Sequence, residues 1–282
     1  MAHTLSARKI GFLGGGAMAE AIFSRLLSAQ ISAPEAIHVR EVDPERCQYL
    51  QTQYGLRLAT SFEALLASVE VLILAIKPQV FTSLASSLTS LQSHPETLVI
   101  SIMAGTPLAA VEAVTGKSPV IRVMPNTPAM VGAGISAFAP GSYAQEDHQQ
   151  IAAAIFEAVG EVVQVQESLM DAVTALSGSG PAYVAIAIEA LADAGVSVGL
   201  PRGVALQLAL QTVRGTAELL HCGQMHPALL KDKVTSPGGT TIAGIRALEQ
   251  HGFRSAIIEA VQCAYRQSQT LGRLSDQPLS DQ

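Results

Sequence analysis

The sequence of 282 residues predicts an α/β protein in which a doubly wound parallel sheet is followed by an all-helical domain. Two observations lead to this prediction. From Lys9 to about Gln166, short β-branched runs alternate with helix-like segments, which is the pattern of parallel strands joined by crossover helices. After Gln166 the β-branched runs become rare, and long segments rich in Ala, Leu and Gln follow. We therefore expect two domains, residues 1–166 and residues 167–282.

Seven short apolar runs are the expected strands of the first domain. In chain order they are IGFLG, AIHVRE, VEVLILAI, TLVISIM, PVIRVM, ISAFAP and EVVQV. They are nearly continuous in apolar residues, as expected for parallel strands that helices cover on both faces. Turn signals such as Lys77-Pro78 follow the strand ends. Ligands of doubly wound sheets bind at the carboxyl ends of the strands, so these loops hold the candidate site.

The second half of the chain carries four helical patterns, over residues 182–198, 204–222, 241–250 and 254–271. The first of them, AYVAIAIEALADAGVSV, is apolar nearly all round, which in a soluble protein requires burial on every side. Glu189 and Asp193 interrupt it, so we do not expect it to span a membrane. A second subunit is the simplest cover, and we expect a homodimer.

Charge and cysteine content exclude several partners. The net charge is −6 and the 17 Lys and Arg residues form no basic stripe, so nucleic acid is not an expected partner. Cys47, Cys222 and Cys263 are far apart and lack metal-ligand spacing, which predicts reduced, mostly buried thiols and no metal. The apolar run near the N-terminus resembles a secretory leader only superficially, because Glu20 and three consecutive glycines interrupt it. We expect a cytoplasmic protein.

A glycine-rich fingerprint directly follows the first expected strand. The pattern G-x-G-x-x-A falls on Gly14, Gly16 and Ala19 and opens a helical pattern. Gly14 permits the tight turn, Gly16 lets the backbone approach a pyrophosphate, and the helix N-terminus supplies positive potential. The alternative is a glycine-rich turn that binds nothing. The fingerprint predicts a Rossmann-type domain for NAD or NADP, with contacts from Gly14, Gly15, Gly16, Ala17 and Met18.

The end of the second expected strand bears on the choice between the two cofactors. Glu41 lies about twenty residues after the fingerprint, where an acidic group bonds the adenosine ribose hydroxyls, and this favours NADH. Arg40 and Arg46 flank it, and either could instead bind a 2′-phosphate or remain a solvated surface charge. The sequence therefore leaves both cofactors open.

Five runs carry a resemblance to a known family. They are IGFLGGGAMAEAI, AIKPQ, MPNTPAMVGAG, ALSGSGPAY and LKDKVTSPGGTTIAGI, of which SPGGTT is the most specific part. Together, from about Lys9 to Leu271, they resemble the pyrroline-5-carboxylate reductase family. The resemblance implies an enzyme that transfers hydride from NADPH or NADH to the C=N bond of 1-pyrroline-5-carboxylate and so makes L-proline. It also implies an interlocked homodimer that often assembles further into a ring.

The resemblance also indicates which loops of the first domain surround the cofactor. It places Ala75, Lys77, Ala104 and Asn126 around the cofactor and Ser177 beside the nicotinamide. Lys77 and Asn126 are the expected polar contacts. For each of these two, a structural role in a turn or a helix cap explains the sequence equally well.

The SPGGTT segment has the composition of a carboxylate clamp. Ser236 offers a hydroxyl, Gly238 and Gly239 expose backbone amides, and a helix is expected to start near Thr240 or Thr241. From the local sequence alone, the two threonines could simply cap this helix. The resemblance implies instead that Thr241 is the catalytic residue, hydrogen-bonded to the ring nitrogen. The residues then expected to bind the substrate are Ser236, Gly238, Gly239 and Thr240.

Three other classes of protein fit part of the sequence. A β-hydroxyacid dehydrogenase would carry a catalytic lysine early in the second domain, but no lysine lies between Lys117 and Lys231. Reduction of an imine needs no such base. A ketol-acid reductoisomerase needs clustered carboxylates for Mg²⁺, and Glu189 and Asp193 have no close companions in the sequence. A non-catalytic dinucleotide sensor would not need SPGGTT. We expect structural roles for His226, Lys231 and Asp232.

Overall fold

The computed structural model describes Leu5 and residues 8–275 of the chain. Within these residues eight strands form one sheet in the order β3-β2-β1-β4-β5-β6-β7-β8. The strands are β1 (Ile10–Leu13), β2 (Ile37–Arg40), β3 (Arg57–Leu58), β4 (Val71–Leu74), β5 (Leu98–Ser101), β6 (Val120–Met124), β7 (Gly134–Pro140) and β8 (Gly160–Gln164). All but the two-residue β3 were predicted from the sequence. The order reverses beside β1, as in doubly wound folds.

The last two strands run against the other six. β6 and β7 are antiparallel, with Val123 opposite Phe138, and β8 is parallel to β7. Residues 125–133 connect β6 to β7 and hold only the short helix η4 (Thr127–Val131). Parallel neighbours need a crossover of about a dozen residues or more, so β7 turns back. The doubly wound fold class is confirmed, but the prediction of parallel pairing is wrong at β7.

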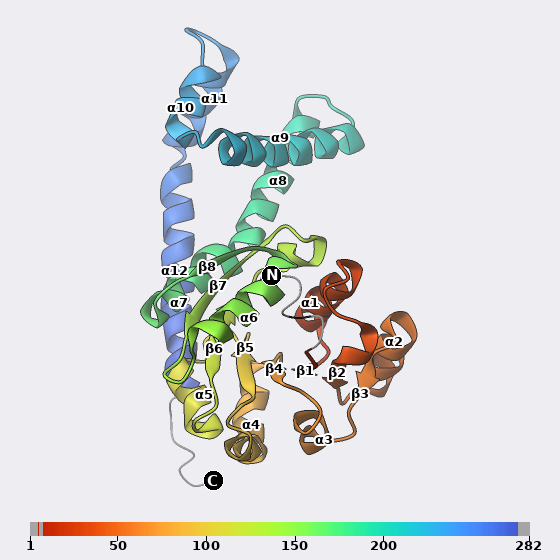
Figure 1. The fold of residues 1–282 in the computed structure, drawn as a ribbon. Helices are drawn as coiled ribbons and strands as arrows, with labels where there is room; N and C mark the ends of the chain where they lie inside the picture. Colours follow the sequence, from red (N-terminus) through yellow and green to blue (C-terminus); the bar gives the residue numbers. More distant parts are fainter. Residues whose placement is uncertain (1–4, 6–7, 276–282) are drawn as a thin grey trace. The chain divides into compact units, whose positions relative to one another are not determined.

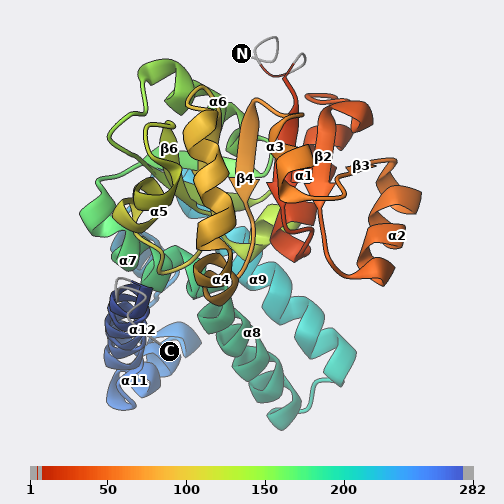
Figure 2. The same cartoon turned by 90° about the horizontal axis from the view of Figure 1, so that it is seen from below.

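Two buried apolar clusters hold helices against opposite faces of the sheet. One joins Phe12 of β1 to Phe23 and Phe156, and the other contains Leu13 and Phe81. The first face carries α1 (Ala17–Ser28), α2 (Pro44–Tyr54) and α6 (Glu146–Glu157), and the second carries α3 (Phe62–Leu66), α4 (Pro78–Leu88) and α5 (Leu108–Thr115). Figure 1 shows α1 and α6 on one side of the strands, and Figure 2 shows the sheet from the side of α3 to α5. With both faces covered, ligands approach at the strand ends.

The helices α1 and α2 begin in different ways. The Asp43 side chain accepts a hydrogen bond of 3.0 Å from the Glu45 amide, and Pro44 takes the first position of α2. Gly55 ends this helix in the left-handed region, at φ 67°. By contrast, α1 begins after Gly16 without a side-chain cap. The first amides of α1 are therefore left for another acceptor.

The chain divides into two compact units. One contains the described residues up to Ser179 and those from Ala264 on, and the other is Gly180–Cys263. The second unit holds α8 (Gly180–Ser197), α9 (Arg202–Gly223), α10 (Pro227–Lys233), α11 (Thr240–Gln250) and the first part of α12 (Phe253–Ser275). The four predicted helical patterns correspond to α8, α9, α11 and α12. The domain boundary predicted between residues 166 and 167 stays a prediction.

The last part of α12 belongs to the sheet-containing unit. The Ser268 hydroxyl donates a hydrogen bond of 2.7 Å to Asp171, and Leu271 lies against the backbone at Gly105. A Cβ atom built on Gly105 would come within 3.2 Å of the Leu271 Cβ atom. This helix therefore packs on the loop that follows β5.

Few side chains of the helical unit are buried in the single chain. Among its described residues, only Ala192, Ala205 and Ala209 are buried apolar residues, whereas Ile186 is 66% exposed.

The stretch Glu167–Ser197 is long and apolar enough to cross a membrane by length and composition, which is weak evidence by itself. None of the three cysteines forms a disulfide within the described residues, but Cys222 and Cys263 are exposed in the single chain, contrary to the prediction of mostly buried thiols.

Candidate functional site

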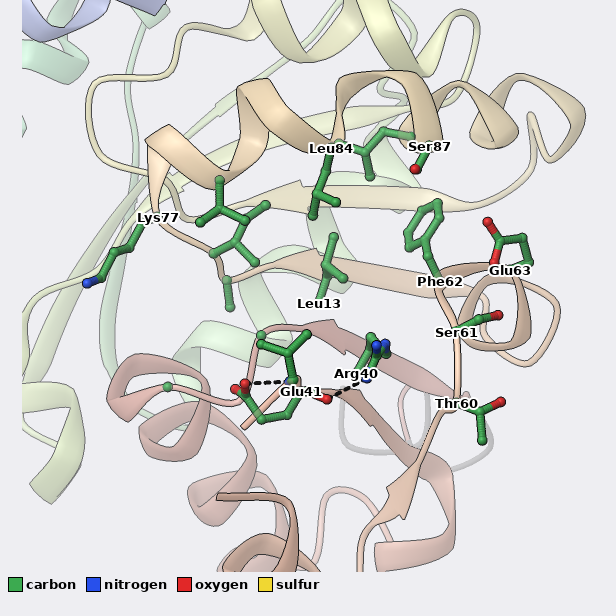
Figure 3. Close-up of a pocket in the computed structure, with 17 residues that line it drawn as sticks. Leu13, Arg40, Glu41, Thr60, Ser61, Phe62, Glu63, Lys77, Leu84 and Ser87 are labelled. Carbon is green, nitrogen blue, oxygen red and sulfur yellow. Dashed lines mark hydrogen bonds between the residues drawn. The ribbon is translucent and has the colours of Figure 1, made fainter. Parts of the chain in front are cut away.

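A pocket of about 690 Å³ opens at the carboxyl ends of β1, β2 and β4. These ends lie side by side because Leu13 pairs with both Arg40 and Leu74. Residues predicted to bind the cofactor that line this pocket are Gly14, Gly16, Glu41, Ala75 and Lys77. The remaining lining residues are Leu13, Arg40, Val42, Thr60, Ser61, Phe62, Glu63, Ile76, Val80, Leu84, Ser87 and Leu88, many of which are labelled in Figure 3. Its volume suits a dinucleotide half.

The glycine turn after β1 has the shape that a pyrophosphate requires. Gly14 adopts φ +98°, and a Cβ atom there would lie 2.6 Å from the carbonyl oxygen of Ala75. Gly16 has open space within 4 Å, so an approaching ligand can reach its backbone. Gly16 and Ala17 are exposed, whereas Gly15 is buried. The uncapped amides at the start of α1 therefore fit the phosphates of NAD or NADP.

Glu41 lines the pocket with its side chain turned toward backbone amides. The Val42 amide donates to its Oε1 atom at 2.6 Å, and the Arg40 guanidinium donates to its carbonyl oxygen at 2.6 Å; both bonds are drawn in Figure 3. The predicted contact of Glu41 with ribose stays a prediction, as does the choice between Arg40 and Arg46 for a 2′-phosphate.

Asn126 holds two loops together. It is 9% exposed; its Oδ1 atom accepts from the Ile135 amide at 3.0 Å, and its Nδ2 atom donates to the Ser177 carbonyl at 3.2 Å. Ser177 lies in the π-helical turn Thr174–Gly178, and its hydroxyl donates to the carbonyl of Val173, the residue before that turn. The side chain does not cap η4, which begins after it, so the role is neither of the two expected from the sequence, and the cofactor contact of Asn126 stays a prediction.

Two further residues of the sheet-containing unit, Lys77 and Ala104, were predicted to contact the cofactor. Lys77 is exposed and precedes α4 as its N-cap, without a side-chain hydrogen bond to the helix. Ala104 is half-buried in the loop after β5 and does not line the pocket. Their roles at the cofactor stay predictions.

The SPGGTT segment forms a tight turn and then a helix. The Gly239 amide donates to the Ser236 carbonyl at 3.0 Å, with Gly238 in the left-handed region at φ +67°. Pro at the second position and such a glycine at the third are typical of a type II turn. Gly239 is the N-cap of α11, which has no side-chain cap. Thr240 and Thr241 therefore do not cap the helix, which was the alternative that the local sequence left open.

Neighbouring polar residues have the structural roles expected of them. The Nδ1 atom of His226 accepts a hydrogen bond of 3.2 Å from the Ala228 amide and so caps α10. Lys231 and Asp232 form an exposed ion pair of 3.3 Å. The described residues contain no group of three or more His, Cys, Asp and Glu that could hold a metal ion.

Sequence reasoning missed the side of the pocket formed by Thr60, Ser61 and Phe62. These residues follow β3, which has two residues only and gives no strand signal in the sequence. A Ser before a helical run is a capping signal, and Ser61 does cap α3 by accepting from the Ala64 amide. That signal locates a helix start but says nothing about a ligand.

Comparison with known proteins gives matches over nearly the whole chain. Residues 167–271 match the family model for pyrroline-5-carboxylate reductase dimerisation, and residues 9–105 match that for NADP oxidoreductase coenzyme F420-dependent. A pyrroline-5-carboxylate reductase of Synechocystis sp. is 54% identical over 94% of this chain and 98% of its own length.

Two solved structures are also similar to the chain. That of a pyrroline-5-carboxylate reductase from Coxiella burnetii has a TM-score of 0.87 and 32% identity, over 94% of this chain and 99% of its own. That of a Plasmodium falciparum pyrroline carboxylate reductase with NADP bound has a TM-score of 0.84 and 30% identity, over 95% of this chain and 99% of its own.

Proposed function

The chain belongs to the pyrroline-5-carboxylate reductase family, and from this membership we propose that it reduces 1-pyrroline-5-carboxylate to L-proline with NADPH or NADH. One observation carries the proposal: relatives match both compact units over 94% of the chain, so the dinucleotide pocket and the SPGGTT segment occur together. A non-catalytic sensor would need only the dinucleotide pocket. The β-hydroxyacid dehydrogenase alternative is not favoured.

The cofactor is a nicotinamide dinucleotide, NADP or NAD. When bound, it supplies the hydride that the imine carbon accepts. Gly14, Gly16 and Ala17 are proposed to hold the pyrophosphate at the start of α1, where the amides are open. Lys77, Ala104 and Ser177 are proposed as further contacts.

The substrate is proposed to bind at SPGGTT. The Ser236 hydroxyl and the amides of Gly238 and Thr240 bind the carboxylate, because a helix start with free amides suits an anion. Gly239 was also expected to bind the substrate, but its amide donates to the Ser236 carbonyl and so holds the turn. The Thr241 hydroxyl, which does not cap the helix, hydrogen-bonds the ring nitrogen. The imine carbon receives the hydride and the ring nitrogen receives one proton from the Thr241 hydroxyl, which water restores, so the C=N bond becomes the CH–NH bond of proline.

The function is tested by adding 1-pyrroline-5-carboxylate to the protein with NADPH or NADH and following the absorbance of the reduced nicotinamide. We expect substrate-dependent oxidation of the cofactor and formation of proline. Protein that binds the cofactor but leaves it reduced would contradict the proposal.

Subunit assembly is proposed to cover the helical unit. Ile186, Leu208 and Ile258 are each more than half exposed in the single chain, and the matched family model describes dimerisation. A second copy, rather than a lipid bilayer, is proposed to cover this surface, and the dimers are proposed to assemble further into a ring. We also propose a cytoplasmic location, without a nucleic-acid or membrane partner.

Light scattering should give a mass of at least twice the 29.4 kDa of one chain at micromolar concentration. Ile186→Lys should shift the protein toward the monomer, because burying an unpaired ammonium group in an interface costs a large free energy. Tyr143→Lys, at an exposed position of the other unit, should leave the mass unchanged. A stable monomer of the unmodified chain would contradict the proposal.

A further inference from the structure

Two side chains from the second strand and helix hold the buried Gly15 by its backbone. Its amide donates to the Oε2 atom of Glu41 at 2.8 Å, and its carbonyl oxygen accepts from the Nε atom of Arg46 at 2.7 Å. Glu41 directly follows β2, and Arg46 lies in the first turn of α2. The peptide groups on both sides of Gly15, in the middle of the cofactor loop, are thus fixed from outside the loop.

The carboxylate of Glu41 is largely committed to this backbone. Besides Gly15, the amides of Val42 and Asp43 donate to its Oε1 atom, at 2.6 and 3.1 Å. Burial by itself would raise the pKa of Glu41, but these three amides and the charge of Arg46 lower the pKa below its ordinary value. The carboxylate of Glu41 is therefore an anion at neutral pH, and it accepts hydrogen bonds from three backbone amides of its own chain.

Arg46 is held in turn by a second polar group. Its guanidinium contacts Glu20 at 2.5 Å and lies over the ring of Tyr49, 5.0 Å from its centroid. Glu20 also accepts from the hydroxyls of Tyr49 at 3.0 Å and Tyr54 at 2.7 Å. Glu20 and Arg46 expose only 21% and 24% of their side chains, so this pair is less screened by water than a surface pair.

Packing explains why position 15 is glycine. A Cβ atom there would lie 2.6 Å from the Cδ1 atom of Leu50 and 3.3 Å from the Oε2 atom of Glu41. Leu50 is fully buried in the core under α2. The space is therefore filled, and the next two residues, Gly16 and Ala17, are exposed.

We propose that Glu41 and Arg46 are positioning residues that fix the glycine-rich loop for the cofactor pyrophosphate, and that Glu41 acts through Gly15 rather than as a ligand of the ribose. The inference deepens the proposed function and rests on it for the identity of the cofactor. It replaces the expectation that the acidic residue after the second strand reads the ribose hydroxyls.

The test measures binding of ADP and of 2′,3′-dideoxy-ADP by calorimetry. The two ligands share the pyrophosphate and differ only in the ribose hydroxyls. Glu41→Gln keeps the shape of the side chain but turns one acceptor into a donor that faces backbone amides. Arg46→Met removes the hydrogen bond that the guanidinium donates to the carbonyl of Gly15. We expect each variant to weaken both ligands by the same factor, about tenfold, as for loss of a charge-assisted hydrogen bond.

The matched control is Glu112→Gln. Glu112 also accepts a backbone amide, that of Ser142 at 2.5 Å, but it does not line the pocket, and its variant should bind both ligands normally. If Glu41→Gln weakened only ADP, Glu41 would be a ribose ligand and the inference would fail. Unchanged affinities, or no binding of ADP by the unmodified chain, would overturn it as well.

A second readout separates positioning from simple destabilisation. In the reductase assay, Glu41→Gln and Arg46→Met should raise KM for NADH and NADPH together and change kcat by less than about twofold, because uniform binding is lost. A lowered Tm with unchanged KM would show a merely structural role. ADP binding needs no imine substrate, so a protein that binds ADP as expected without reductase activity would contradict the proposed function alone.

Discussion

Thr241→Val should lower kcat and kcat/KM together by about tenfold to a thousandfold, which is the range for one hydrogen bond that strengthens in a transition state. Valine keeps the β-branched shape and removes only the hydroxyl. Gly239 is the N-cap of α11 and the helix has no side-chain cap, so Tm should stay unchanged. Steady-state kinetics with saturating cofactor, together with thermal unfolding, measure both effects.

Two comparisons make this result specific. Ser236→Ala should mainly raise KM for 1-pyrroline-5-carboxylate, because a carboxylate remote from the reacting bond is held about equally in ground and transition states. Thr216→Val removes a hydroxyl that donates to the Thr212 carbonyl of α9, at 2.7 Å, and should change neither parameter. If Thr241→Val kept full kcat, the nitrogen would receive its proton from water or arrive already protonated.

Gly16→Ala should raise KM for both cofactors by about tenfold to a hundredfold without lowering Tm. The added methyl group has open space within 4 Å in the folded chain, and φ at Gly16 is −68°, which alanine adopts readily. The methyl group would therefore meet only the approaching pyrophosphate. Cofactor titration and thermal unfolding of the same preparation test this.

Gly14→Ala is the matched comparison, because the same added atom meets the protein itself. At φ +98° an L side chain is strained, and its Cβ atom would lie 2.6 Å from the carbonyl oxygen of Ala75, which is backbone. We expect a lower Tm as well as weaker cofactor binding. We infer that the fold requires glycine at position 14, whereas only the ligand requires it at position 16. Equal effects of the two variants on Tm would contradict this inference.

Much of the fold could be predicted because the signals are local. Helices pack on both faces of β1, β4 and β5, and these strands are continuous apolar runs in the sequence. The turn at Gly14 directly follows the first of them. The start of α10 at His226 and Pro227 is equally local, since its cap joins residues two apart. The direction of β7 could not be predicted from its own sequence, because it depends on the short connection from β6.

The sequence by itself determined the dinucleotide fold, the cofactor class and the family of this protein, since these depend on residue types at short and fixed spacings. Only the tertiary structure decided what Glu41, Arg46 and Asn126 touch. Their bonds to Gly15 and Ser177 cross 26, 31 and 51 residues of chain. The packing of β2 and α2 beside α1 brings Glu41 and Arg46 to Gly15, and the folding of the loop after β6 brings Asn126 to Ser177.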